Sequence, residues 1–108
     1  MFTYTHVSLH RVVDGDTVIL TIDLGFDVFL HETVRLESID APERFTAAGP
    51  KTTERLKALL ANGILRLETS SFDKYHRAVG QLWIPGEPRS VSQVLLDEGL
   101  ARPYVPGK

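Results

Sequence analysis

Four carboxylates stand in two short turn segments and could act together on one cation. Asp14 and Asp16 flank a glycine in the first segment, and Asp40 and Glu43 flank an Ala-Pro pair in the second. Each segment alone is typical of turn chemistry, because Asp and Gly favour turns and proline fixes one backbone dihedral. Together their oxygens would suit a hard cation such as Ca²⁺. This function requires the two turns to meet in space, which the spacing leaves open.

Two arginines could add a site for a phosphate group. Arg35 lies five residues before Asp40, and Arg77 ends a polar loop that also holds Lys74 and Tyr75. A guanidinium presents a rigid fork of donors that matches two phosphate oxygens, and it stays charged at any working pH. Two arginines aimed at a phosphorus under attack would stabilise the transition state more than the ground state. A surface ion pair is the alternative role of each arginine.

Other catalytic patterns are absent from the sequence. It contains no Gly-x-Ser-x-Gly, no glycine-rich phosphate loop and no His-Glu-x-x-His, and it has no cysteine to form a disulfide, a thiolate zinc site or a nucleophile. The four histidines are scattered, and we predict surface or structural roles for them: His6, His10, His31 and His76. A metal-independent ribonuclease that uses histidines as acid and base stays an alternative. Activity that persists in EDTA and is lost in the His76→Ala variant would favour it.

The charge of the chain is unevenly distributed. The 108 residues are the size of one domain, so residues 1–108 are predicted to form a single unit. A net charge of −2 does not match the basic excess of a tight nonspecific nucleic-acid binder. Residues 1–43 carry eight acidic and two basic side chains, whereas residues 44–108 carry six acidic and ten basic ones. Such a division suits a cation site that faces a phosphate-binding surface, although short chains also segregate charge by chance.

The elements that must position these residues begin with three predicted strands. They cover residues 3–13, 17–24 and 28–39, with Asp-Gly-Asp and Gly-Phe-Asp as the turns between them. In the second strand, successive side chains are expected to point to opposite faces. One face holds Val18, Leu20, Ile22 and Leu24, and the other holds Thr17, Ile19, Thr21 and Asp23.

Two helices and two more strands follow. A helix over residues 49–63 is predicted from Pro50 in its first turn, from Asn62-Gly63 at its end, and from an apolar stripe of Thr53, Leu56, Leu59 and Leu60. Strands over 64–70 and 78–84 come next. A short helix over 90–99 has Ser90 or Ser92 as its cap and Gly99 past its end. This order predicts a mainly β protein, α+β by content: a five-stranded Greek-key barrel of the OB-fold type, with a helix after the third strand and a short helix after the fifth.

The N-terminal residues show no basic segment followed by an uninterrupted apolar one, so we expect no signal peptide. No apolar run approaches the roughly 20 residues that span a bilayer. A cytoplasmic protein without a membrane segment is therefore expected.

Four motifs occur in a family-specific order: V-V-D-G-D-T-V, V-R-L-E-S-I-D-A-P-E, D-K-Y-H-R and L-L-D-E-G-L-A-R-P-Y. From Val12 to Tyr104 the chain resembles the staphylococcal (micrococcal) nuclease family, also called thermonuclease-like. The resemblance implies an OB-fold barrel with added helices and Ca²⁺-dependent hydrolysis of DNA and RNA. The products would carry a 3′-phosphate and a free 5′-hydroxyl. We expect low base specificity, because phosphate contacts carry no sequence information, and a preference for single-stranded regions.

The resemblance also implies a role for each matching residue. Asp16 and Asp40 would be the carboxylate ligands of Ca²⁺, and the backbone carbonyl of Ala41 would be a third ligand. Glu43 matches the carboxylate usually assigned as the general base that activates water. The other matches are the phosphate-clamping Arg35 and Arg77, the nucleotide-pocket residues Lys74 and Tyr75, the acid Asp14 that shapes the site, and Tyr104, which lies about one residue from a family tyrosine.

The sequence also departs from the family pattern. Ala41 stands where Thr is common, and His76 stands where Gly is common, so His76 would be strained if that position needs a positive φ. The chain ends at P-Y-V-P-G-K, without room for the third C-terminal helix of longer relatives. We therefore expect a monomer, or a weak dimer that covers an exposed apolar patch.

A noncatalytic OB-fold module that binds nucleic acid or protein is the main alternative function. Such a module would be expected to lose an acid or an arginine. All five of the principal residues are retained here, which favours catalysis: Asp16, Arg35, Asp40, Glu43 and Arg77.

Overall fold

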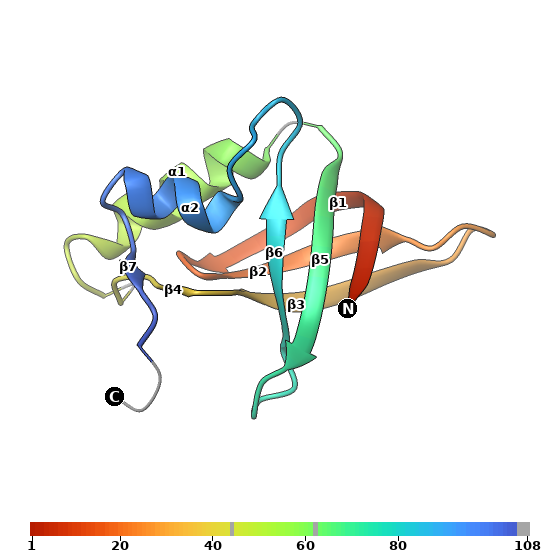
Figure 1. Cartoon of the computed structure of the whole chain (residues 1–108), viewed down its shortest axis with the longest axis horizontal. Helices are drawn as coiled ribbons and strands as arrows, with labels where there is room; N and C mark the ends of the chain where they lie inside the picture. The colour runs from red at the N-terminus through yellow and green to blue at the C-terminus, as the bar shows by residue number, and fades with distance from the viewer. Residues whose placement is uncertain (44, 62, 106–108) are drawn as a thin grey trace.

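Five strands close into a barrel in the computed structural model, which describes residues 1–43, 45–61 and 63–105. Around the barrel the order is β1-β2-β3-β6-β5, and only β3 and β6 run parallel to each other (Figure 1). This closed order confirms the predicted OB-fold barrel. The strands are β1 (Phe2–Asp14), β2 (Thr17–Asp23), β3 (Phe29–Leu36), β5 (Leu65–Phe72) and β6 (Ala78–Trp83).

Strand β1 closes the barrel because it pairs with two other strands. Its first half pairs with β5 and its second half with β2, with register shifts along both ladders. Bulges of this kind bend a strand and increase its twist. In β2 the predicted alternation holds for Val18, Leu20 and Ile22, which are buried. Leu24 is exposed because it lies past the last residue of β2 that pairs with β1.

The two helices lie at the end of the molecule opposite the tip of the β2–β3 hairpin (Figure 1). Helix α1 (Gly49–Leu60) buries Thr52, Leu56 and Leu60 at a spacing of four residues. Thr53 and Leu59 of the predicted stripe are half-buried. The fully buried threonine is Thr52, and its hydroxyl donates to the carbonyl of Leu100 at 2.6 Å. Of the predicted helix end, Gly63 has a φ of +93°, and Asn62 lies outside the described residues.

Helix α2 (Val91–Asp97) lies within the predicted range of 90–99 and is bounded by two of the predicted signals, Ser90 and Gly99. The Ser90 hydroxyl accepts a hydrogen bond from the backbone N–H of Gln93 at 3.1 Å, which makes Ser90 the cap. Ser92 is instead buried inside the helix. Gly99 follows the last turn with a φ of +72°, a conformation that glycine adopts without steric cost.

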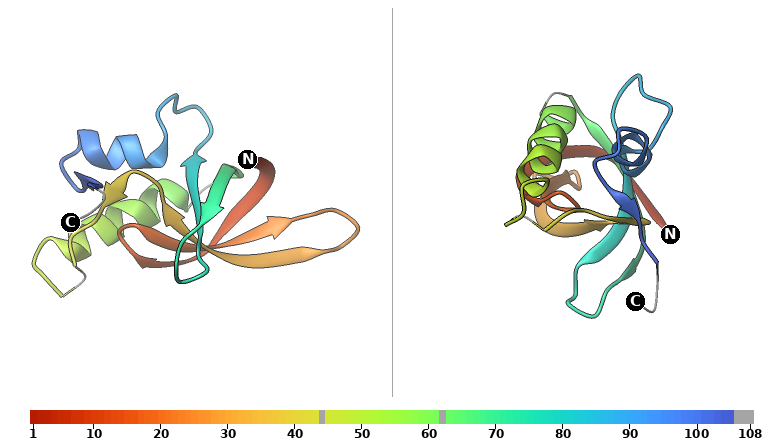
Figure 2. Two further views of the ribbon diagram at one scale, coloured as in Figure 1. Left: turned by 60° about the horizontal axis from the view of Figure 1, so that its bottom comes forward. Right: turned by 90° about the vertical axis from the view of Figure 1, so that its left-hand side faces the viewer.

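The third predicted strand was too long. Strand β3 ends at Leu36, the chain turns at Ser38 with a φ of +73°, and β4 (Ile39–Asp40) follows. Strand β4 pairs with β7 (Arg102–Pro103) in a small sheet separate from the barrel (Figure 2). This small sheet places the Asp-Ala-Pro turn close to residues 102–104, which include Tyr104.

One apolar core fills the barrel and continues under both helices. The largest fully buried side chains of the core are Leu20, Leu36, Ile39, Leu56, Leu60, Leu65, Leu67, Leu82 and Leu95.

Among the residues described, no helix is long and apolar enough to cross a membrane.

Candidate active site

All ten site residues predicted from the sequence line one cleft of about 1050 Å³. The fold brings together three segments that are distant in the sequence: the β1–β2 turn, the turn after β4 and the loop between β5 and β6. The predicted residues in this cleft are Asp14, Asp16, Arg35, Asp40, Ala41, Glu43, Lys74, Tyr75, Arg77 and Tyr104.

Asp16 joins the two acidic turns. Its Oδ2 accepts a hydrogen bond from the backbone N–H of Ala41 at 3.0 Å, and its backbone carbonyl accepts one from Leu36 at 2.8 Å. The condition set by the sequence, that the two turns meet, is therefore fulfilled by a direct bond between them.

Gly15 allows the first turn to approach the second so closely. A Cβ at this position would lie 2.6 Å from the Thr52 Cγ2 and 2.7 Å from the Ala41 Cβ, well inside van der Waals contact. Glycine is needed here for space rather than for an unusual backbone conformation.

We expect Gly15→Ala to lower the free energy of unfolding by about 1–3 kcal/mol, the usual effect of overpacking a tight contact. Urea unfolding of both proteins measures this difference. The matched variant Gly15→Ala/Thr52→Ser removes the clashing methyl group and keeps a hydroxyl for the Leu100 carbonyl, so it should recover part of the loss. An unchanged midpoint in Gly15→Ala would contradict the close approach of the turns.

Arg35 forms the centre of the acidic side of the cleft. One terminal nitrogen donates to the carbonyl of Leu36 at 2.7 Å, and the other donates to the carbonyl of Ile39 at 2.7 Å. The second nitrogen also lies 3.1 Å from Asp40 Oδ1 and 3.5 Å from Asp16 Oδ2. Both carboxylates therefore share one guanidinium nitrogen, and the side chain is only 15% exposed.

Asp14 lies beside Asp16 in a partly buried position. Its Oδ1 accepts a hydrogen bond from the backbone N–H of Asp16 at 3.2 Å. Burial raises the pKa of Asp14, and its hydrogen bond and repulsion with the Asp16 side chain raise it further. The folded, metal-free protein thus holds a carboxylate where ionisation is unfavourable.

We expect Asp14→Asn to raise the free energy of unfolding at neutral pH in EDTA. A raised pKa in the folded state means that ionised Asp14 opposes folding above that pKa; below its ordinary value of 3.8 the group is protonated in both states. The advantage of Asn should accordingly be present near pH 7 and vanish near pH 3. Urea unfolding at both pH values measures it, and an equal advantage at both would rule out the electrostatic cause.

Asp73 positions Arg77, a role that the sequence interpretation missed. Its Oδ2 accepts from Arg77 Nε at 2.6 Å, and its Oδ1 accepts from the backbone N–H groups of Tyr75 at 2.8 Å and Arg77 at 3.0 Å. Burial alone would raise the pKa of Asp73, but the hydrogen bonds from Arg77 and Tyr75 outweigh it and hold that pKa below its usual value. An Asp side chain that accepts a hydrogen bond from the backbone N–H two residues later is a recognisable turn pattern, and this pattern could have identified the role of Asp73.

Thr17 links the basic and acidic sides of the cleft. Its buried hydroxyl donates to Asp16 Oδ1 at 3.1 Å, and it lies 3.5 Å from a terminal nitrogen of Arg77. Thr17 belongs to the D-G-D-T motif, so the sequence also contained a signal for this residue.

Aromatic and basic side chains form one wall of the same cleft: Lys74, Tyr75, Arg77 and Tyr104. The Lys74 ammonium and the Arg77 guanidinium each lie 5.3 Å from the centre of the Tyr75 ring. Tyr75 and Tyr104 are both exposed, and the backbone N–H of Tyr104 donates to the Ser38 carbonyl at 2.9 Å. Both rings are therefore available for stacking on a planar ligand.

His76 does not line this cleft. Its φ of +61° confirms that the position, where glycine is common in the family, needs a left-handed backbone. None of the four histidines lines the cleft, and His10 stacks on His31 at 4.4 Å elsewhere on the barrel. The geometry therefore gives no support to catalysis by histidines.

Glu43 differs from the other acids of the cleft because its side chain is exposed and its carboxylate has no partner among the described residues. Its backbone carbonyl accepts from the N–H and the hydroxyl of Thr46 at 3.0 and 2.7 Å, which fixes the main chain. Within residues 1–43, 45–61 and 63–105, the Glu43 carboxylate forms no hydrogen bond or ion pair. An exposed carboxylate on a fixed backbone can accept a proton from a water molecule in the cleft.

The donor atoms of the cleft fit a hard cation. Within the described chain, no group of three or more His, Asp or Glu side chains is close enough to hold a metal ion unaided. The carboxylates of Asp16 and Asp40 nevertheless contact the same Arg35 nitrogen, and Asp16 also contacts the backbone of Ala41. The metal-binding atoms that these three residues could offer are all oxygens. Ca²⁺ accepts carboxylate, carbonyl and water oxygens together, so this set fits it when water or a ligand supplies the rest.

Comparison with known proteins agrees with this arrangement. The sequence model of the family described as staphylococcal nuclease homologue matches residues 33–107. The chain belongs to the staphylococcal nuclease family. The match includes Arg35, Asp40, Glu43 and Arg77, whereas the turn with Asp16 precedes it.

Several curated relatives in this family have nuclease names. The chain is 37% identical to the SPbeta prophage-derived endonuclease YokF of Bacillus subtilis, over 89% of this chain and 33% of that protein. It is 37% identical to the thermonuclease of Staphylococcus intermedius, over 85% of this chain and 55% of that protein. It is 29% identical to the micrococcal nuclease of Shigella flexneri, over 87% and 55% respectively. The chain thus spans between a third and about half of the length of these three relatives.

Proposed function

We propose that this chain is a nuclease that hydrolyses phosphodiester bonds in DNA, RNA or both. The observation that carries the proposal is the placement of an exposed carboxylate, Glu43, in one cleft with two guanidinium groups, Arg35 and Arg77. A proton acceptor and two phosphate-binding groups are what an attack of water on phosphorus requires. The nuclease names of three relatives support the same reaction class.

In the proposed reaction, Glu43 accepts a proton from a water molecule as the water oxygen attacks phosphorus. A new P–O bond forms on one side of phosphorus while the bond to the 5′ oxygen breaks on the other. The departing 5′ oxygen then gains a proton. The products carry a 3′-phosphate and a 5′-hydroxyl, as the resemblance to the family implies.

The two arginines bind the phosphoryl oxygens, whose negative charge increases during the attack. Arg77 is ready for this role because Asp73 and Thr17 fix its guanidinium from two sides. Arg35 is held by two carbonyls of its own turn, which orient its donors at the edge of the cleft. A preorganised donor of this kind commonly contributes about 10²–10³ in rate.

We further propose that the enzyme depends on Ca²⁺, held by Asp16, Asp40 and the backbone carbonyl of Ala41. Bound there, Ca²⁺ would neutralise the acidic turns and polarise a phosphate oxygen as a Lewis acid. The acidic side of the cleft would then no longer repel the substrate backbone.

The aromatic wall favours single-stranded substrates. Tyr75 and Tyr104 can stack on unpaired bases, a contact that every base offers, and Lys74 can reach a neighbouring phosphate. Phosphate contacts carry no base information, so we expect low base specificity.

The test is incubation of the purified chain with end-labelled single-stranded DNA and RNA in millimolar Ca²⁺ and in excess EDTA. We expect cleavage with Ca²⁺, at least about 10²-fold slower cleavage in EDTA, and 3′-phosphate ends on the products. Binding without cleavage by a folded protein would indicate the noncatalytic OB-fold module. Undiminished cleavage in EDTA would contradict the Ca²⁺ requirement.

A further inference from the structure

The β2–β3 hairpin extends past the barrel as a two-stranded arm, which we define as residues 23–30 (Figure 2). Within the arm, Asp23 of β2 pairs with Phe29 of β3. The pairing of β1 with β2 ends one residue earlier, at Ile22. No third strand supports this arm among the residues described.

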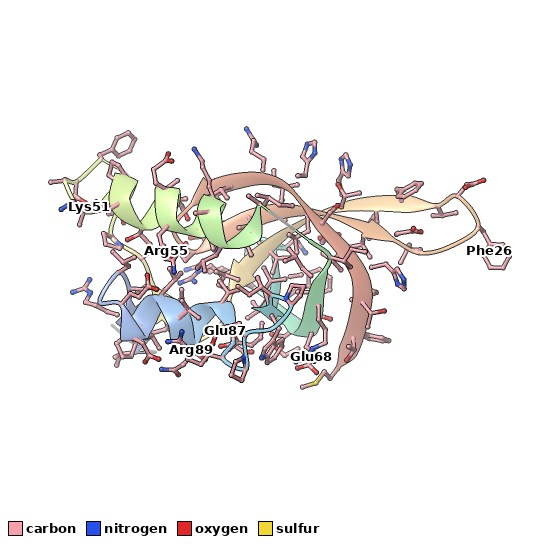
Figure 3. The ribbon with its side chains drawn as sticks, turned by 90° about the horizontal axis from the view of Figure 1, so that it is seen from above. Phe26, Lys51, Arg55, Glu68, Glu87 and Arg89 are labelled. Atoms are coloured by element: carbon pink, nitrogen blue, oxygen red, sulfur yellow. The ribbon has the colours of Figure 1, made fainter. Side chains whose placement is uncertain are left out.

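The arm presents apolar side chains to water at a strained tip. Phe26 is 101% exposed, and the structure shows it pointing away from the molecule (Figure 3). Phe26 and Asp27 have φ values of +54° and +59°, which side chains other than glycine rarely adopt. Behind the tip, the other exposed apolar residues of the arm are Leu24, Val28, Phe29 and Leu30.

The charges of the arm limit what it can bind. Asp23 and Asp27 are its only charged residues, and no Lys or Arg occurs between Arg11 and Arg35. Nucleic-acid phosphates and anionic lipid headgroups would both be repelled by this acidic tip. The arm instead fits an apolar pocket with a basic residue at its rim.

The chain has a pocket of mixed apolar and polar lining, with Arg66 and Glu87 among its residues, away from the cleft. A cavity of about 330 Å³ lies at the end of β5 and β6 nearest α2, and it shares no lining residue with the cleft. Arg66 lies over the Trp83 ring at 4.5 Å. Arg66 forms no ion pair in the described part of the chain, whereas Glu87 is already paired with Arg89 at 2.7 Å. The apolar lining residues are Ile64, Leu65, Trp83, Ile84, Pro85 and Pro88.

We propose that the arm of one copy of this chain docks into the Trp83 pocket of a second copy. Phe26 enters the cavity beside its apolar lining residues, and Asp27 lies beside Arg66. Within one copy the arm cannot do this, because Phe26 lies at one end of the long axis and points away from the molecule, whereas Glu87 of the pocket lining lies toward its middle (Figure 3). If each copy both gives its arm and receives the other, the assembly closes as a dimer.

Sedimentation equilibrium from micromolar to millimolar chain concentration measures this association without substrate, so it is independent of nuclease activity. We expect a concentration-dependent dimer whose dissociation constant rises about tenfold or more in Phe26→Ser, because a buried phenylalanine is lost from the contact. Phe2→Ser is the matched control, because Phe2 is 69% exposed but lies outside the arm. It should leave the dissociation constant unchanged. Circular dichroism confirms that each variant is folded.

A charge exchange tests the contact between the arm and the pocket. Asp27→Lys and Arg66→Asp should each weaken the dimer, and the double variant should restore much of the affinity, because the pair is then reversed rather than broken. A mixture of Phe26→Ser with Ile64→Asp should also associate, since one copy retains its pocket and the other its arm.

Three results would overturn the proposal. The first is a monomer at every concentration, and the second is a dimer that Phe26→Ser leaves intact. The third is Phe26-dependent binding to single-stranded DNA or to vesicles of neutral phosphatidylcholine while the chain stays monomeric. That result would assign the arm to a different ligand.

Discussion

Glu43→Gln is expected to reduce kcat by about 10²–10⁴-fold, the usual contribution of a general base. Glutamine keeps the size of the side chain and can still hydrogen-bond to water, but it cannot accept the proton that the attacking water must lose. The substitution should change stability by no more than about 0.5 kcal/mol, because the Glu43 carboxylate is exposed and has no partner in the described chain. Affinity for a nucleotide ligand should change little for the same reason.

The matched control is Glu37→Gln, in which a second carboxylate lining the same cleft is neutralised. Glu37 lies near the Ser70 hydroxyl at 3.4 Å, and its backbone pairs with Gly80, so it is placed for structure rather than for proton transfer. Single-turnover cleavage of single-stranded DNA in saturating Ca²⁺ separates the two variants. Equal losses in both would mean that net charge in the cleft matters, and that Glu43 is not the base.

The barrel could be predicted from the sequence because its strands follow a two-residue period around a common core. Val18, Leu20 and Ile22 show this pattern, and glycine or aspartate marks the turns. The small β4–β7 sheet could not be predicted in the same way. Two-residue strands have no period, and β7 contains Pro103, which the sequence alone would place outside a strand.

The same difference applies to the site. The residue types and order of the motifs identified the acids and arginines, but their meeting depends on contacts between distant segments. The bond from Ala41 to Asp16 joins positions 25 residues apart, and Thr17 meets Arg77 across 60 residues. The barrel register, together with the turn at Ser38 and the small β4–β7 sheet, brings these pairs together. Asp73 and Thr17 were missed because a turn residue and a strand threonine have ordinary structural roles that the sequence alone explains.

Arg35→Lys is expected to produce the second large effect, and it should affect both activity and stability. Lysine keeps the positive charge near Asp16 and Asp40, but its single ammonium cannot reproduce the planar fork of donors. The hydrogen bonds to the carbonyls of Leu36 and Ile39 would be lost at a side chain that is only 15% exposed. We expect a decrease of about 1–3 kcal/mol in unfolding free energy and about 10²–10³ in kcat.

Arg77→Lys provides the comparison that separates these two effects. Among the described residues, the Arg77 side chain makes no hydrogen bond to a strand carbonyl, and its hydrogen-bond partners are Asp73 and Thr17. Its replacement should therefore reduce kcat by a similar factor with a smaller loss of stability. Both variants are assayed well below their melting temperatures, with unfolding measured separately in urea. If Arg35→Lys lost stability but kept kcat within about twofold, its guanidinium would only fasten the turn, and Arg77 alone would bind the reacting phosphate.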